Sequence, residues 1–128
     1  MLPTILIVDD DPQVRKFCRA TLEASGYAAR EAGDGREALV IVGSSVVDLI
    51  LLDLCMPDMD GLECLKALRA ESPQLKVITM SGFMHGVLLP AAKHLGGAAT
   101  LAKPFSPDAL LSLVEQVLAD TGRVTSSD

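Results

Sequence analysis

The sequence has no run of about 18 apolar residues, the length that a helix needs to cross a bilayer, and no secretory leader pattern after Met1. We therefore expect a cytoplasmic protein without a membrane-spanning helix. Basic residues are also scarce, since 11 lysines and arginines stand against 17 acidic residues, for a formal net charge of -6 at pH 7. Nucleic-acid binding needs a clustered basic face, and we find no such cluster, so direct binding to nucleic acid is not expected.

Cysteines are few, and their spacing matches no metal site. Cys18, Cys55 and Cys64 are an odd number without paired spacing, so we expect reduced thiols that behave as small apolar side chains. The length of 128 residues suits a single domain with one core. We place this domain at residues 1–121 and expect a flexible polar tail, or the start of a linker, at 122–128.

Short apolar runs alternate with helical patterns along the chain. The predicted strands cover residues 4–8, 27–32, 49–53, 75–80 and 98–102. The predicted helices cover about 12–25, 35–44, 61–71, 83–94 and 107–120. Such alternation with right-handed crossovers gives a parallel sheet covered by helices on both faces. The second strand is the poorest in apolar residues, as an edge strand should be, so we predict an α/β, flavodoxin-like (βα)5 doubly wound sheet of five parallel strands in the order 2-1-3-4-5.

Polar side chains stand at the carboxyl ends of four predicted strands. They are Asp9 and Asp10 after the first strand, Asp53 at the end of the third, Ser81 after the fourth and Lys103 after the fifth. Open α/β sheets bind ligands beyond the carboxyl ends of the strands, where the strand order reverses. That point lies between the first and third strands here. We therefore expect these side chains to share one crevice, with Asp53 presented at its strand tip rather than buried.

Three carboxylates and a lysine in one crevice point to phosphoryl transfer. Carboxylates at close range repel one another and are stable at neutral pH only with a cation, and Mg²⁺ suits an all-oxygen site that keeps some waters. Asp53 can act as a nucleophile toward phosphorus and form an acyl phosphate, with the metal and Lys103 neutralising the transferring oxygens. The Ser81 hydroxyl can donate a hydrogen bond to a phosphoryl oxygen. Asp9 and Asp10 then serve as ligands of the metal.

The motifs resemble the receiver domain of two-component response regulators over roughly residues 4–120. They are Asp9-Asp10, Asp53 followed by Met56-Pro57-x-Met59-Asp60-Gly61, Ser81-Gly82, and Lys103-Pro104-Phe105. The resemblance implies a phosphorelay switch rather than an enzyme with an external substrate. It implies that Asp53 accepts phosphate from a sensor histidine kinase or a phosphotransfer protein. It also implies that Asp10 coordinates Mg²⁺ directly and Asp9 mainly through water, with the backbone carbonyl of Cys55 as a further ligand.

The resemblance also assigns roles to the residues around the phosphate. Lys103 would pair with the Asp53 carboxylate and then with the phosphate. Ser81 would move toward the phosphate and draw the following loop inward. Phe83, two residues beyond Ser81, would flank the phosphate, and we expect it to restrict the attacking water and lengthen the lifetime of the acyl phosphate.

The chain departs from the receiver pattern at one position. Many receivers carry Tyr or Phe three residues before the lysine, whereas this sequence has Thr100. The signal would then leave through a smaller change at Thr100 or through residues 83–94. The sequence leaves open the cognate kinase, the output domain or target, and whether phosphorylation produces a homodimer.

Three other functions fit parts of the pattern. A phosphatase or phosphotransferase of haloacid-dehalogenase type would use Asp9 as its nucleophile within Asp9-x-Asp11, but Gln13 stands where such enzymes carry Thr or Val. A flavin-binding carrier would need a Ser/Thr/Gly-rich phosphate loop after the first strand, where the acidic residues repel phosphate. A degenerate receiver that only docks partners would not need the complete set of five polar residues.

Overall fold

The computed structural model describes residues 2–54, 56, 61–82 and 99–120. Within these residues the strands are β1 (Thr4–Val8), β2 (Ala28–Ala32), β3 (Leu49–Asp53), β4 (Lys76–Ser81) and β5 (Ala99–Ala102). They form one sheet in the order β2-β1-β3-β4-β5, and all four neighbouring pairs are parallel. The predicted strand order is therefore confirmed, with β1 beside β3 at the point where the order reverses.

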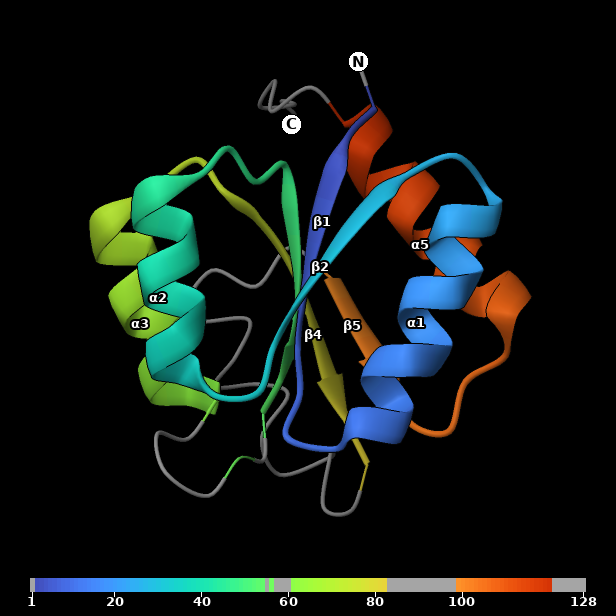
Figure 1. Cartoon of the computed structure of the whole chain (residues 1–128), viewed down its shortest axis with the longest axis horizontal. Coiled ribbons are helices and arrows are strands. Elements are labelled where there is room, and N and C mark those ends of the chain that lie inside the picture. Colours follow the sequence, from blue (N-terminus) through green and yellow to red (C-terminus); the bar gives the residue numbers. More distant parts are fainter. Residues whose placement is uncertain (1, 55, 57–60, 83–98, 121–128) are drawn as a thin grey trace, which may run out of the picture.

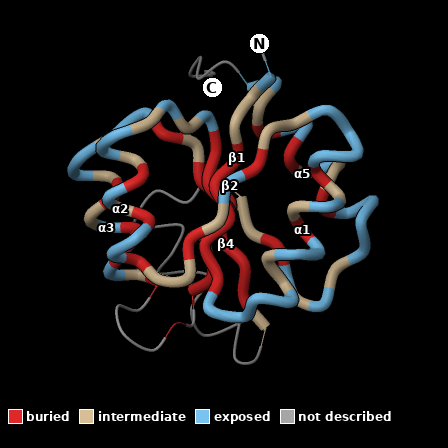
Figure 2. Tube along the Cα trace, in the orientation of Figure 1, coloured by how far each residue is buried: buried red, intermediate tan, exposed pale blue. Residues whose placement is uncertain are grey.

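Helices cover both faces of this sheet. The described helices are α1 (Pro12–Ala24), α2 (Gly35–Ser44), α3 (Gly61–Glu71) and α5 (Pro107–Ala119). Helices α2 and α3 lie on one face, and α1 and α5 lie on the other (Figure 1). Side chains alternate along a strand, so Leu6 and Val8 enter the cluster under α2 and α3, whereas Ile5 and Ile7 enter the cluster under α1 and α5. Both clusters are buried (Figure 2), which explains why the inner strands are continuous apolar runs.

The ends of α1 follow the signals in the sequence. The Asp11 side chain accepts a hydrogen bond from the backbone N–H of Gln13 at 2.9 Å, and Pro12 occupies the first helical position. Beyond Ser25, Gly26 has a φ of +93°, in the left-handed region that favours glycine. Because Asp11 caps the helix, α1 begins directly after Asp9 and Asp10. The cap therefore fixes the loop that carries both carboxylates.

One predicted core position of α1 is wrong. The helical spacing of Phe17, Cys18 and Leu22 predicts one inner stripe, and Cys18 and Leu22 are fully buried, yet Phe17 is 37% exposed. Its ring centroid lies 6.0 Å from that of Phe105, in the segment between β5 and α5. The apolar face of an amphipathic helix is wider than the surface that contacts the sheet. A residue at the border of that face, such as Phe17, therefore lies at the edge of the core and stays partly exposed.

Several predictions fall outside the described residues. These are the helix over 83–94 with Phe83, the Cys55 carbonyl and the tail at 122–128, and they stay predictions. Within the described part of the chain, Cys18 and Cys64 are buried free thiols, as expected for reduced cysteines. None of the described helices combines the length and the apolar character that crossing a membrane requires.

Candidate functional site

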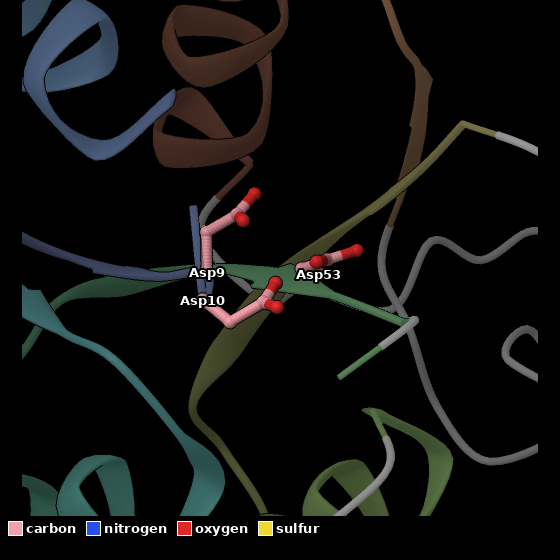
Figure 3. A group of neighbouring side chains, drawn as sticks. All are labelled: Asp9, Asp10 and Asp53. Atoms are coloured by element: carbon pink, nitrogen blue, oxygen red, sulfur yellow. The ribbon is translucent and has the colours of Figure 1, made fainter. Parts of the chain in front are cut away.

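The carboxyl ends of β1 and β3 bring three aspartates together. Each of Asp9, Asp10 and Asp53 offers a carboxylate oxygen, and these oxygens all lie within 4.8 Å of one another (Figure 3). Asp9 is fully buried, Asp53 is 3% exposed and Asp10 is exposed. The cluster that the sequence predicted is therefore assembled, and it meets solvent at Asp10.

The expectation that Asp53 is presented rather than buried is wrong. Asp53 is the last residue of β3, but β4 continues alongside it and pairs Met80 with Asp53. The start of α3 also folds back, since the Gly61 N–H donates to the Leu54 carbonyl at 3.0 Å. A Cβ on Gly61 would collide with the backbone of Leu54 and Asp53, so only glycine permits this approach. The strand tip is thus enclosed by its neighbours.

Lys103 reaches the cluster from the end of β5. Its Nζ lies 2.7 Å from Oδ2 of Asp9 and 3.6 Å from Oδ2 of Asp53. Burial lowers the pKa of Lys103, but the hydrogen bond to Asp9 and the charges of Asp53 and Asp9 outweigh it, so the pKa is raised overall. The lysine is therefore charged at neutral pH and lies closer to Asp9 than to Asp53, the carboxylate that the resemblance paired it with.

Ser81 is the last residue of β4 and is fully buried. Among the described side chains, its Oγ is the buried polar atom without a hydrogen-bond partner. Its backbone carbonyl accepts a hydrogen bond from the Lys103 N–H at 2.9 Å, so the two residues are held beside each other. An unsatisfied buried hydroxyl costs roughly 1–3 kcal/mol, and such a group at a strand end suggests a ligand that would complete it.

Asp9 is bonded through both its side chain and its backbone. Its Oδ1 accepts from the Asp11 N–H at 2.9 Å, and its Oδ2 accepts from Lys103. Its backbone carbonyl accepts from Nη1 of Arg15 at 2.6 Å. No local pattern in the sequence points to Arg15, because its bonds run to Asp9 and to Glu31, a residue of β2 that is 16 positions away. Only the docking of α1 against β2 brings them together.

Other predicted residues lie around the cluster. Met56 is buried in the cluster under α2 and α3 and acts there as a packing residue. Thr100 lies half-buried on β5, opposite Thr79 of β4. An open pocket of about 490 Å³ beside Lys103 is walled by Phe17 and Phe105. The exposed edge of Phe17 therefore lines a hollow next to the acidic cluster.

Comparison with protein families gives a match over most of the chain. The model described as "Response regulator receiver domain" matches residues 5–115. "Sporulation initiation phosphotransferase F" of Bacillus subtilis (strain 168) is 35% identical over 114 residues, covering 89% of this chain and 92% of that protein. "Response regulator MprA" of Mycolicibacterium vanbaalenii is 36% identical over 117 residues, covering 91% of this chain and 51% of that protein. This chain thus spans about half the length of the MprA relatives.

Two solved structures superpose closely on this chain. The chemotaxis protein CheY4 of Vibrio cholerae superposes with a TM-score of 0.87 at 32% sequence identity, covering 91% of this chain and 99% of that one. A CheY-like response regulator receiver domain protein from Methanospirillum hungatei JF-1 superposes with a TM-score of 0.90 at 30% identity, covering 94% and 96%. The flavodoxin-like fold predicted from the sequence is therefore confirmed.

Proposed function

Because this chain belongs to the response regulator receiver domain family, whose members are phosphorylation-dependent switches rather than classical enzymes, we propose that Asp53 is its phosphoacceptor. The observation that carries the proposal is that the carboxylate of Asp9 is already hydrogen-bonded. Both carboxylate oxygens of Asp9 already accept hydrogen bonds, from the Asp11 N–H and from Lys103. Asp53 lies within reach of the same lysine, at 3.6 Å, and of both other acids. The haloacid-dehalogenase alternative, which needs Asp9 as nucleophile, is not supported.

The proposed step is a phosphoryl transfer in which one bond replaces another. A carboxylate oxygen of Asp53 attacks the phosphorus of a phosphohistidine, and the new P–O bond forms as the P–N bond breaks. The imidazole of the donor leaves with the electron pair of that bond. Lys103 stabilises the negative charge around Asp53, and the unsatisfied Ser81 hydroxyl donates to a phosphoryl oxygen.

The acidic cluster suits Mg²⁺, the ion that receiver domains bind at their phosphorylation site. Its donors are all oxygen, and the exposure of Asp10 leaves room for waters that Mg²⁺ retains. Asp10 and Asp53 would hold the ion directly, and Asp9, whose oxygens are occupied, mainly through water. The Cys55 carbonyl is the further proposed ligand. When bound, the ion would supply positive charge that neutralises the transferring oxygens.

The proposed switch couples phosphate at Asp53 to a change in the surface that a partner reads. A phosphoryl group that bonds Ser81 and Lys103 favours one arrangement of the strand ends and shifts the population toward it. Many receivers carry Tyr or Phe at the position of Thr100 on β5. Here a smaller change at Thr100 would take the place of the rotation of that aromatic side chain. The partners proposed are a sensor histidine kinase or phosphotransfer protein and an output domain or protein, in the cytoplasm. Dimerisation on phosphorylation is a further proposal, whose test is the mass in solution with and without phosphate.

Acetyl phosphate tests the proposal without a kinase. With Mg²⁺, the protein should gain the mass of one phosphoryl group, and the gain should need the metal and be lost in Asp53→Asn. Asp48→Asn serves as the control, because Asp48 bonds to Thr4 near the amino end of β1, remote from the cluster. Labelling that survives Asp53→Asn but disappears in Asp9→Asn would overturn the proposal.

A further inference from the structure

Arg15 links the acidic cluster to the edge strand through two separate donors. Its Nη1 donates to the Asp9 backbone carbonyl at 2.6 Å, and its Nε donates to Oε1 of Glu31 at 3.0 Å. Both side chains are largely withdrawn from solvent, with exposed fractions of 20% for Arg15 and 29% for Glu31. Glu31 lies on β2, the strand that pairs with β1. The guanidinium therefore joins the end of β1 to its neighbour across the start of α1.

The carbonyl that Arg15 holds belongs to the peptide between Asp9 and Asp10. A peptide group is planar, so fixing the direction of the Asp9 carbonyl also fixes the direction in which the chain enters Asp10. The Asp9 N–H is held from the other side by the Ala32 carbonyl at 3.2 Å. Asp10 itself is exposed, and its carboxylate has no hydrogen-bond or ion-pair partner among the residues that the structure describes. Its position depends on its backbone.

We infer that Arg15 is a positioning residue that sets the Mg²⁺ affinity of the acidic cluster by fixing the Asp9–Asp10 peptide. The inference rests on the proposed magnesium site. Octahedral coordination at short distances tolerates little displacement of a ligand, so a peptide that rotates moves Asp10 out of range. Groups that orient metal ligands without touching the metal typically change affinity by about 10- to 100-fold when removed. The ion pair with Glu31 offsets the charge of Arg15, which leaves geometry as the main contribution.

Arg19 provides a matched control for this role. It carries the same charge on the same helix, and it bonds to the same glutamate, since Nη1 lies 3.1 Å from Oε2 of Glu31. Its other bond goes to Glu23, one turn further along α1. Removing Arg19 thus costs one contact with Glu31 and one positive charge, as removing Arg15 does, but leaves the Asp9 carbonyl bond in place.

The experiment measures metal binding and not phosphorylation. Mn²⁺ binding followed by EPR, with Mg²⁺ as competitor, gives the Mg²⁺ dissociation constant for the parent, Arg15→Met and Arg19→Met. We expect Arg15→Met to weaken Mg²⁺ binding about tenfold, and Arg19→Met to change it by less than about twofold. Urea unfolding without metal shows whether each variant is folded, and Arg15→Met should lose more stability than Arg19→Met, because it leaves the Asp9 carbonyl without this donor. Should Arg15→Met not fold, Arg15→Lys replaces it, with a weakening of about threefold or more, because one ammonium does not replace two separate donors.

The results separate this inference from the proposed function. Equal Mg²⁺ affinity in the parent and Arg15→Met, or equal weakening in Arg15→Met and Arg19→Met, would overturn the role of Arg15 alone. A parent that binds no Mg²⁺ would overturn both this role and the magnesium site on which it rests.

Discussion

The ammonium group of Lys103 lies 2.7 Å from Asp9 and 3.6 Å from Asp53, so the lysine is held more closely by Asp9, which would hold the metal mainly through water, than by Asp53, the proposed phosphoacceptor. Lysine and Mg²⁺ are both cations drawn to the same carboxylates. In this arrangement Lys103 neutralises part of the cluster, and an arriving ion must compete with it for the charge of Asp9.

Replacing Lys103 with methionine should therefore strengthen Mg²⁺ binding while it impairs phosphorylation. Loss of a competing charge at this distance is expected to tighten Mg²⁺ binding about 3- to 10-fold, where tenfold corresponds to about 1.4 kcal/mol. Phosphorylation by acetyl phosphate at saturating Mg²⁺ should be at least about tenfold slower, because Lys103 no longer stabilises the transferring oxygens. Mn²⁺ competition and intact mass measure the two effects. If Lys103→Met binds Mg²⁺ more weakly than the parent, then Lys103 and Mg²⁺ do not compete for Asp9.

Ser81→Ala should separate stability from switching. The Ser81 hydroxyl is buried without a partner among the described residues, so its removal should leave the free energy of unfolding unchanged or raise it by about 1 kcal/mol. The same variant should lose part of the conformational shift on phosphorylation, because no hydroxyl meets the phosphoryl oxygen. Urea unfolding and amide exchange with and without phosphate test the two halves. A loss of more than about 1 kcal/mol without phosphate would show that the hydroxyl is already satisfied.

Two glycines should respond in opposite directions to alanine. Gly43 lies within α2, where a Cβ would approach only the mobile end of the Glu71 side chain, so Gly43→Ala should stabilise the protein by about 0.5–1 kcal/mol. At Gly61 a Cβ meets the backbone of Leu54 and Asp53, so Gly61→Ala should destabilise it by about 2 kcal/mol or more. The midpoint of urea unfolding should be higher than that of the parent for Gly43→Ala and lower for Gly61→Ala. A Gly61→Ala protein as stable as the parent would contradict the enclosure of the β3 tip.

Buried Cys64 should make stability fall at alkaline pH. Burial, with a smaller contribution from the charge of Asp34, raises its pKa from 9.0 to about 11. A thiol with a raised folded pKa favours folding below its unfolded pKa, and this contribution is lost as the pH rises from about 9 to 11. Cys64→Ala should reduce the decline of the unfolding free energy over this interval, and the decline that remains includes the contribution of buried Cys18, whose pKa is raised to about 12. If the unfolding free energy falls equally steeply with pH in the parent and in Cys64→Ala, the pKa of Cys64 is not raised by folding.

The strand order and the residues at the carboxyl edge could be predicted because they follow from local patterns. Continuous apolar runs mark buried parallel strands, and the residue that ends each run must lie at the shared edge. Asp9, Asp53, Ser81 and Lys103 were found in this way. Their meeting needs only the topology, which the alternation of strands and helices determines.

Features that depend on how elements dock could not be predicted in the same way. The burial of Asp53 comes from the approach of Gly61, and the nearer partner of Lys103 depends on how β5 is set against β1, with β3 and β4 between them in the sheet. Arg15 was missed because its partner Glu31 belongs to another element. Each of these contacts joins segments whose relative position no local pattern encodes.

The role of Asp53 as phosphoacceptor is tested by identifying the phosphorylated residue directly. Borohydride reduces an aspartyl phosphate to homoserine, so peptide mass spectrometry after treatment with acetyl phosphate and Mg²⁺ names the acceptor. We expect homoserine at position 53 and unchanged aspartates at positions 9 and 10. Homoserine at position 9 or 10, with Asp53 unmodified, would contradict it.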